Sequence, residues 1–166
     1  MPLTQVNLSA SVSWALARAV TGFADVTHGP DAKSFSLNAL DPDVWNEVFG
    51  AQYTIAAAGT QAVDLRTFTD FAGTSVTADK ALAVIVLVEG AGADRLNVLP
   101  HGTDGLQWFF GGTTEGVDIP GGGMLMFSEG ADSTGTTVDA THRQLLLTNN
   151  GAADLVVTVV AILSDT

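Results

Sequence analysis

Hydrophobic and polar residues alternate along the first part of the chain, over residues 4–16. The apolar positions are Val6, Leu8, Ala10, Val12, Trp14 and Leu16. Gln, Asn or Ser stands between most of them. Successive side chains of a strand point to opposite faces, so this pattern predicts a strand with one buried face and one polar face.

Two later runs, residues 81–88 and 155–163, are apolar without alternation and contain no charged residue. Their Val and Ile residues favour a pleated strand over a helix. An antiparallel sandwich usually exposes one face of each sheet to water, so its strands alternate. We therefore expect both runs to be covered on both faces. The scarcity of charged residues favours a second subunit as the cover, and a loop such as residues 21–33 is the alternative.

Turn-forming residues separate the predicted strands. Asn and Gly tolerate the positive φ of a tight turn, so we predict a closing hairpin that turns at residues 149–151. A second hairpin is expected around residues 58–60. Pro and Gly at residues 28–31 predict a loop, which a short strand at residues 35–39 follows. Residues 44–49 are expected to form a single helical turn.

The remaining apolar runs are short and lie between Gly-rich segments, at residues 95–99, 106–110, 116–119 and 124–128. Short strands at such spacing are typical of sandwiches and barrels. We predict an all-β fold, an antiparallel β-sandwich or jelly roll of about 9–11 short strands with at most one or two helical turns. The length of 166 residues fits one domain over residues 1–166.

Charged residues make up only 14% of the chain, and the formal net charge is −12. Such a surface repels phosphate backbones, and no basic stripe is present, so direct nucleic-acid binding is not expected. Cysteine is absent, which removes disulfides and thiolate metal sites. We expect a soluble chain without membrane contact, because its apolar runs are too short for a spanning helix and its start lacks the pattern of a secretory signal.

No residue pattern announces a reaction. The histidines His28, His101 and His142 are far apart and lack metal-ligand spacing. The chain contains no G-x-S-x-G elbow, and the glycines after Pro120 are not followed by the Lys-Ser/Thr of a phosphate loop. We therefore expect no enzyme, no catalytic residue and no cofactor.

An acidic loop holds Glu129, Asp132 and Asp139. Calcium accepts carboxylate and carbonyl oxygens, but the regular D-x-D-x-D-G spacing is missing. A solvated loop is the preferred interpretation, so no metal site is predicted, and calcium stays open as the alternative.

Aromatic residues offer a possible binding surface, with Trp108, Phe110 and Tyr53 as its candidates. Aromatic rings can stack on sugars, but they are equally common in cores and subunit interfaces, which we prefer. The predicted interface residues are Val86, Val157, Val159, Trp108 and Phe110.

Several stretches together resemble the layout of small virion structural proteins of tailed bacteriophages. These are the Ser/Val/Ala strand at residues 8–17, the Asp-Leu element at 57–65, the Gly-x-x-Val-Thr step at 73–77, the Pro-Gly-Gly entry at 119–127 and the closing apolar strands at 144–163. The likeness covers most of the chain, and residues 21–49 depart from it.

The resemblance implies a non-enzymatic part of a virion that offers no catalytic residue to transfer. It implies an all-β protein that associates with itself, with a trimer as one candidate state, and that docks on capsid or other particle proteins. Capsid decoration or an accessory head or tail role would suit it. The alternative is a carbohydrate-binding β-sandwich module that uses the exposed aromatics. A β-sandwich hydrolase ranks last, because no acid, base or nucleophile can be named.

Overall fold

The computed structural model describes residues 8–18, 26–37, 47–70, 73–90, 93–107, 110, 114–128 and 135–165, with the backbone alone described up to residue 37. These residues form antiparallel strands and contain no helix. The strands are β1 (Leu8–Arg18), β2 (Val26–Leu37), β3 (Glu47–Ile55), β4 (Thr60–Asp64), β5 (Thr67–Thr69), β6 (Ser75–Thr77), β7 (Lys80–Glu89), β8 (Arg95–Pro100), β9 (Val117–Pro120), β10 (Met124–Ser128), β11 (Thr136–Thr137), β12 (Gln144–Asn149) and β13 (Leu155–Ser164).

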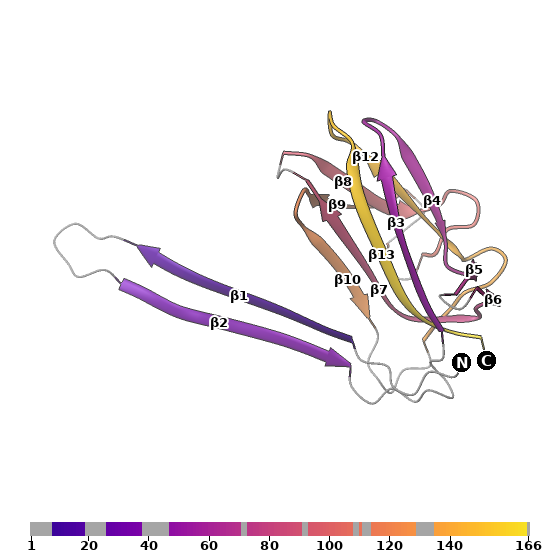
Figure 1. Cartoon of the computed structure of the whole chain (residues 1–166), viewed down its shortest axis with the longest axis horizontal. Helices are drawn as coiled ribbons and strands as arrows, with labels where there is room; N and C mark the ends of the chain where they lie inside the picture. The colour runs from indigo at the N-terminus through magenta and orange to yellow at the C-terminus, as the bar shows by residue number, and fades with distance from the viewer. Residues whose placement is uncertain are drawn as a thin grey trace.

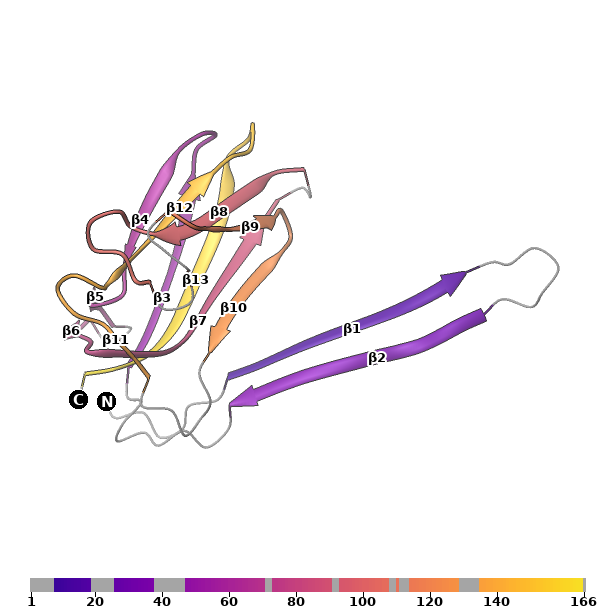
Figure 2. The same ribbon diagram turned by 180° about the vertical axis from the view of Figure 1, so that it is seen from behind.

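Two sheets stack to form a sandwich (Figure 1). One has the strand order β10-β7-β13-β3, with β11 added to β7, and we call it the β7–β13 sheet. The other has the order β4-β12-β8-β9, and we call it the β8–β12 sheet. The reverse view brings the β8–β12 sheet forward (Figure 2). The prediction of an all-β sandwich is confirmed.

Aliphatic side chains fill the space between the sheets. The largest fully buried ones are Leu65, Leu82, Leu96, Leu106, Leu145, Leu147, Leu155, Leu163, Val63, Val84, Val86 and Val98. Each sheet contributes one face, because alternate residues of its strands point inward. Near one end, the rings of Phe49 and Phe68 meet edge to face with centroids 5.4 Å apart.

The two apolar runs singled out from the sequence become neighbouring central strands. β7 and β13 pair antiparallel, with Val86 opposite Val159 and Val88 opposite Val157. β10 lies on the other side of β7, and β3 lies on the other side of β13. Both strands are thus interior strands of the sheet, which their β-branched composition favours.

Both predicted hairpins are wrong. β12 pairs with β4 and β8, whereas β13 pairs with β3 and β7, so the chain crosses from one sheet to the other between them. The same crossing separates β3 from β4. The predicted turn at residues 149–151 shows no positive φ. The apolar pattern predicts strands correctly, but it does not tell whether consecutive strands pair or face each other across a core.

A buried asparagine stabilises the place where these crossings meet. The side-chain Nδ2 of Asn149 donates to the carbonyl oxygens of Ile55 and Ala56, both at 3.0 Å, and of Ala153 at 2.8 Å. Its Oδ1 accepts from the backbone N–H of Gly151 at 2.8 Å. Asn149 is fully buried, so its amide replaces water for backbone groups of both crossings.

Other local predictions also need correction. The loop expected at residues 28–31 lies within β2, and Gly29 and Pro30 have no partners there because the register shifts opposite residues 14–16. Proline lacks an N–H and is tolerated at such an irregularity. The helical turn expected at residues 44–49 is wrong from Glu47 onward, where β3 begins. The strand expected at residues 106–110 is absent from the described residues there.

β1 and β2 form a ribbon that stands apart from the sandwich. Among the described strands they pair only with each other. In both views the ribbon extends away from the two stacked sheets (Figures 1 and 2). The alternative that residues 21–33 cover the sheet as a loop fails for residues 26–33, which belong to β2. That all 166 residues form one domain stays a prediction.

Replacing Asn149 by alanine should destabilise the sandwich. The substitution leaves buried backbone groups without partners, so we expect the free energy of unfolding to fall by about 2–3 kcal/mol. Urea unfolding followed by circular dichroism measures it. The neighbouring Asn150 is exposed, so Asn150→Ala is the matched control and should change stability by about 0.5 kcal/mol or less. Equal effects of the two variants would contradict the role assigned to Asn149.

Candidate functional site

The outward face of the β7–β13 sheet is unusually apolar. Residues that alternate with the core residues of its strands face away from the sandwich. We define the outer apolar patch as Met124 and Met126 of β10, Ile85 and Leu87 of β7, and Val156 and Val160 of β13.

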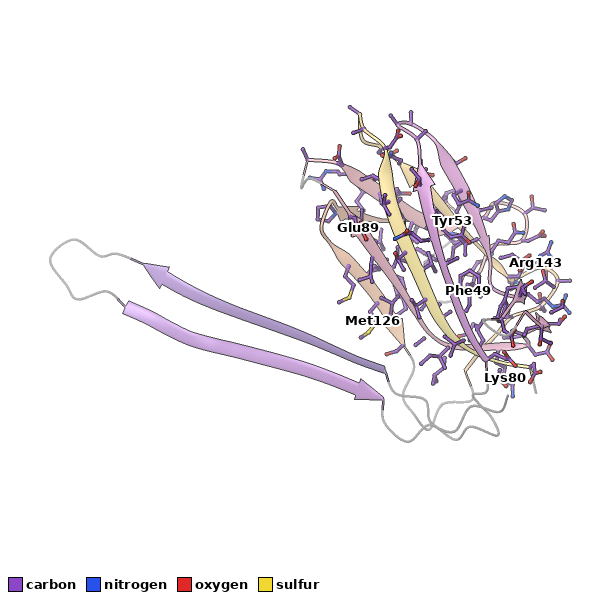
Figure 3. The ribbon with its side chains drawn as sticks, in the orientation of Figure 1. Phe49, Tyr53, Lys80, Glu89, Met126 and Arg143 are labelled. Atoms are coloured by element: carbon purple, nitrogen blue, oxygen red, sulfur yellow. The ribbon has the colours of Figure 1, made fainter. Side chains whose placement is uncertain are left out.

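Strand register makes this patch continuous across the sheet. Met126 lies opposite Ile85, and Ile85 lies opposite Val160. In the next row Met124 lies opposite Leu87. Met126 is labelled beside β10 in Figure 3. Leu87 is 39% exposed and Met124 is 45% exposed. Large apolar side chains placed side by side at the surface are typical of interaction sites.

Polar residues border the patch. Thr158 and Gln52 continue the row of Leu87, and the Gln52 side chain donates to the Thr158 hydroxyl at 3.4 Å. Glu89 and Thr54 flank Val156. An apolar centre with a polar margin is the usual anatomy of a protein interface.

The outward face of the β8–β12 sheet differs in character. Its outward positions carry Arg95, Asn97 and Leu99 on β8, Gln144, Leu146 and Thr148 on β12, and Asp118 on β9. Asn97 donates to the Asp118 carboxylate at 2.8 Å. This face shows the alternation expected of a sheet with water on one side. The two outward faces therefore differ, and the β7–β13 sheet is the one that offers an apolar candidate site.

The predicted interface valines lie on the inner side of that sheet. Val86, Val157 and Val159 are fully buried in the core of the single chain, so they cannot touch a partner while the sandwich is intact. The outward residues next to them, Ile85 and Val160, were missed. The signal that could have found them is Thr158, the one polar residue of the run 155–163, because it lies on the outward side with Val156 and Val160. Pairing with the alternating β3 gives the same assignment.

The aromatic candidates do not form a common platform. Phe110 packs against the core, and the centroid of its ring lies 6.0 Å from that of Phe127. Tyr53 also packs against the core, and burial raises the pKa of its hydroxyl. Trp108 lies outside the described residues. The two described aromatics are therefore packing residues, and neither supports sugar stacking.

A shallow depression brings together Leu106, Gln107, Thr136, Thr137, Asp139 and His142. Here Thr141 Oγ1 and Asp139 Oδ1 each lie 3.1 Å from Nδ1 of His142. A hydrolytic relay needs the hydroxyl and the carboxylate on opposite ring nitrogens. Both groups meet the same nitrogen, so the cluster is a hydrogen-bonded turn and lacks triad geometry.

The carboxylate of Asp139 is held by its own turn. The backbone N–H and then the hydroxyl of Thr141 are the main causes that lower its pKa to about 2. These donors and the N–H of His142 all bond Oδ1. Glu129 and Asp132, the other acids of the proposed calcium loop, lie outside the described residues. Among the residues that are described, no group of three or more His, Cys, Asp or Glu could hold a metal ion.

Arg143 forms a second charged cluster. Its guanidinium lies 3.1 Å from Oδ2 of Asp64 and 3.2 Å from Oδ2 of Asp104. The backbone N–H groups of Arg143 and Gln144 both donate to the carbonyl of Asp104. These contacts fasten the loop after β8 to the end of β4, so the cluster stabilises the β8–β12 sheet.

The comparisons of this sequence with family models and with curated proteins find no match. No protein-family model matches the chain, and no curated protein matches it. Within the described residues, no helix is long and apolar enough to cross a membrane.

Several solved structures show a coarse likeness. An oxalate oxidase is 14% identical over 71% of this chain and 43% of its own, with a TM-score of 0.38. PirA is 14% identical over 68% of this chain and 92% of its own, with a TM-score of 0.41. The structure of tomato aspermy virus is 9% identical over 69% of this chain and 75% of its own, with a TM-score of 0.38. The chain spans less than half of the oxalate oxidase, and likenesses this weak assign no function.

The turn around Asp139 makes a testable prediction about acid titration. Thr141→Val removes the hydroxyl donor and keeps both backbone donors, so the pKa of Asp139 should rise from about 2 toward its ordinary value of 3.8. Carboxyl carbon NMR over an acid titration measures it. Because the folded pKa is lowered, the stabilisation by Asp139 is present above pH 3.8 and is lost as the pH falls through about 2. Thr137→Val is the control on the rim of the same depression. If Thr141→Val left the titration of Asp139 unchanged, the Thr141 hydroxyl would not be one of the causes of the lowered pKa.

Proposed function

We propose that the chain is a non-enzymatic structural protein of a bacteriophage virion. It associates with copies of itself through the outer apolar patch and docks on capsid or other particle proteins, in a decoration or accessory role. The observation that carries the proposal is the apolar outward face of the β7–β13 sheet, beside a β8–β12 sheet whose outward face is mainly polar and has Leu99 and Leu146 among its residues.

Burial energetics favour covering this patch. Removing a Leu or Met side chain from water stabilises by about 1.5–3 kcal/mol. Leu87 and Met124 still have much of that area exposed, and their half-buried neighbours extend it. A stable protein interface buries about 1,200–2,000 Å² in total, so a patch that crosses three strands can form its centre.

The distribution of charge allows a second copy to occupy the outer apolar patch. The chain is strongly acidic, and like charges oppose close approach of two copies. The rows of Met126 and Met124 contain no charged residue across the four strands, and Glu89 lies at their border. Two copies can therefore meet here without placing carboxylates opposite each other.

The virion location is supported by the sequence layout described above, which resembles virion structural proteins of tailed bacteriophages. A dominant acidic surface with few lysines suits the exterior of a particle, where it limits aggregation. An enzymatic role has less support, because the two charged clusters around Asp139 and Arg143 serve a turn and a loop.

A charge introduced into the patch should prevent self-association. Leu87→Glu would bury an unpaired carboxylate in the interface, so we expect the dissociation constant to rise by about 100-fold or more. Size-exclusion chromatography with light scattering over a dilution series measures the change.

The matched control is Leu99→Glu, an outward leucine on the opposite sheet, which should leave the oligomer intact. Circular dichroism should show the same strand content for both variants. A wild-type chain that is strictly monomeric at micromolar concentration would contradict the proposal, and so would an equal loss of association in the two variants.

A further inference from the structure

The chain contains one Asn-Gly sequence, Asn150-Gly151, and it lies where the chain crosses from β12 to β13. Asparagine followed by glycine is especially prone to deamidation, because glycine has no Cβ to obstruct attack by its own backbone nitrogen. Asn150 is exposed, so water reaches its side-chain amide. This crossing between the sheets therefore contains a group that can be modified without an enzyme.

The chemistry of deamidation needs only the backbone and water. The backbone nitrogen of Gly151 loses its proton and attacks Cγ of Asn150. A bond forms between these two atoms, the Cγ–Nδ2 bond breaks, and the side-chain nitrogen leaves as ammonia. Water then opens the cyclic imide at either carbonyl and gives aspartate or isoaspartate at position 150. Nothing is oxidised or reduced, so the solvent supplies every co-reactant.

A hydrogen bond holds the attacking nitrogen in the folded chain. The N–H of Gly151 donates to Oδ1 of the buried Asn149 at 2.8 Å. Nδ2 of the same side chain donates to three backbone carbonyls, so the orientation of this amide is fixed. The N–H of Asn150 donates to the carbonyl of Arg95 at 2.8 Å. The bond from Gly151 to Asn149 must break before the nitrogen attacks, which adds to the barrier of the reaction.

A carboxylate beside Gly151 opposes the loss of its proton. A Cβ built on Gly151 would lie 3.0 Å from Oδ1 of Asp94 and 3.0 Å from Oδ1 of Asn149. A negative charge so close disfavours an anionic nitrogen. The same two contacts leave little room for a side chain at position 151. The packing that favours glycine here therefore also keeps the susceptible Asn-Gly pair in the chain.

We propose that Asn150 is a deamidation site, and that the side chain of Asn149 protects it while the sandwich is folded. Isoaspartate adds one carbon to the backbone between positions 150 and 151, so the hydrogen bonds to Arg95 and Asn149 no longer fit the same spacing. Either product also adds a negative charge next to Asp94. Opening of this crossing is thereby converted into a lasting covalent change.

Incubation of the full chain at mildly alkaline pH tests the proposal, and peptide mass spectrometry follows the conversion of the Asn150 amide to a carboxyl. Asn149→Ala removes the protecting oxygen. The matched control, Leu163→Ala, removes buried aliphatic volume near the far end of β13. Both substitutions lower the stability of the sandwich, so the control separates loss of the hydrogen bond from general destabilisation. The wild-type chain in urea gives the unprotected rate.

We expect the folded wild-type chain to deamidate at Asn150 about tenfold more slowly than the unfolded chain. Asn149→Ala should raise the rate in the folded state by about five- to tenfold, which is the rate equivalent of one hydrogen bond. Leu163→Ala should leave the rate within about twofold of the wild-type value.

Three results would overturn the proposal. Equal rates in the folded and unfolded wild-type chain would remove the protection, and this comparison holds even if Asn149→Ala does not fold. Equal acceleration by the two variants would assign the protection to global stability and not to Asn149. Faster deamidation of another asparagine in the unfolded chain would remove Asn150 as the susceptible site.

Discussion

The antiparallel pairing of β7 with β13 is the interaction on which the sandwich depends. It places two continuous apolar strands side by side at the centre of one sheet, and it joins β10 and β3 into that sheet. One face of the pair supplies Val86, Val157 and Val159 to a core from which water is excluded. The same pairing necessarily turns Ile85, Leu87 and Val160 outward. A strand with apolar residues on both of its faces thus builds a core and an exposed apolar surface in the same step.

The connections between strands follow from this arrangement. Consecutive strands on either side of residues 56–59 and 150–154 lie in opposite sheets, so the chain must cross the edge of the sandwich at each of these places. Asn149 bonds the backbone of both crossings from a fully buried position. Buried backbone groups need partners, and one amide side chain supplies them where neither sheet can. Hydrogen bonds therefore stabilise the end of the sandwich where the chain crosses between sheets, and aliphatic packing stabilises its centre.

Periodicity predicted the strands well and their partners poorly. The alternating run before Trp14 and the apolar runs of β7 and β13 became strands, because composition and period decide local structure. Pairing depends on long-range packing, and residues 149–151 look alike in a hairpin and in a crossing between sheets. The sequence identified the two central strands of the candidate site, but not the side chains that face outward from them. Thr158, the one polar residue of the run 155–163, marks the side that Val156 and Val160 share, and the register with β3 confirms that Val159 faces inward and Val160 outward.

In the proposed assembly another copy covers the outer apolar patch, and two of the three methionines of the chain, Met124 and Met126, report on this cover directly. Methionine oxidation by dilute peroxide requires access to the sulfur atom and is read residue by residue in a mass spectrum. We expect Met124 to oxidise more slowly as protein concentration rises, and Leu87→Glu to abolish this protection. Oxidation of Met124 at one rate across all concentrations of the wild-type chain would contradict self-association through this patch.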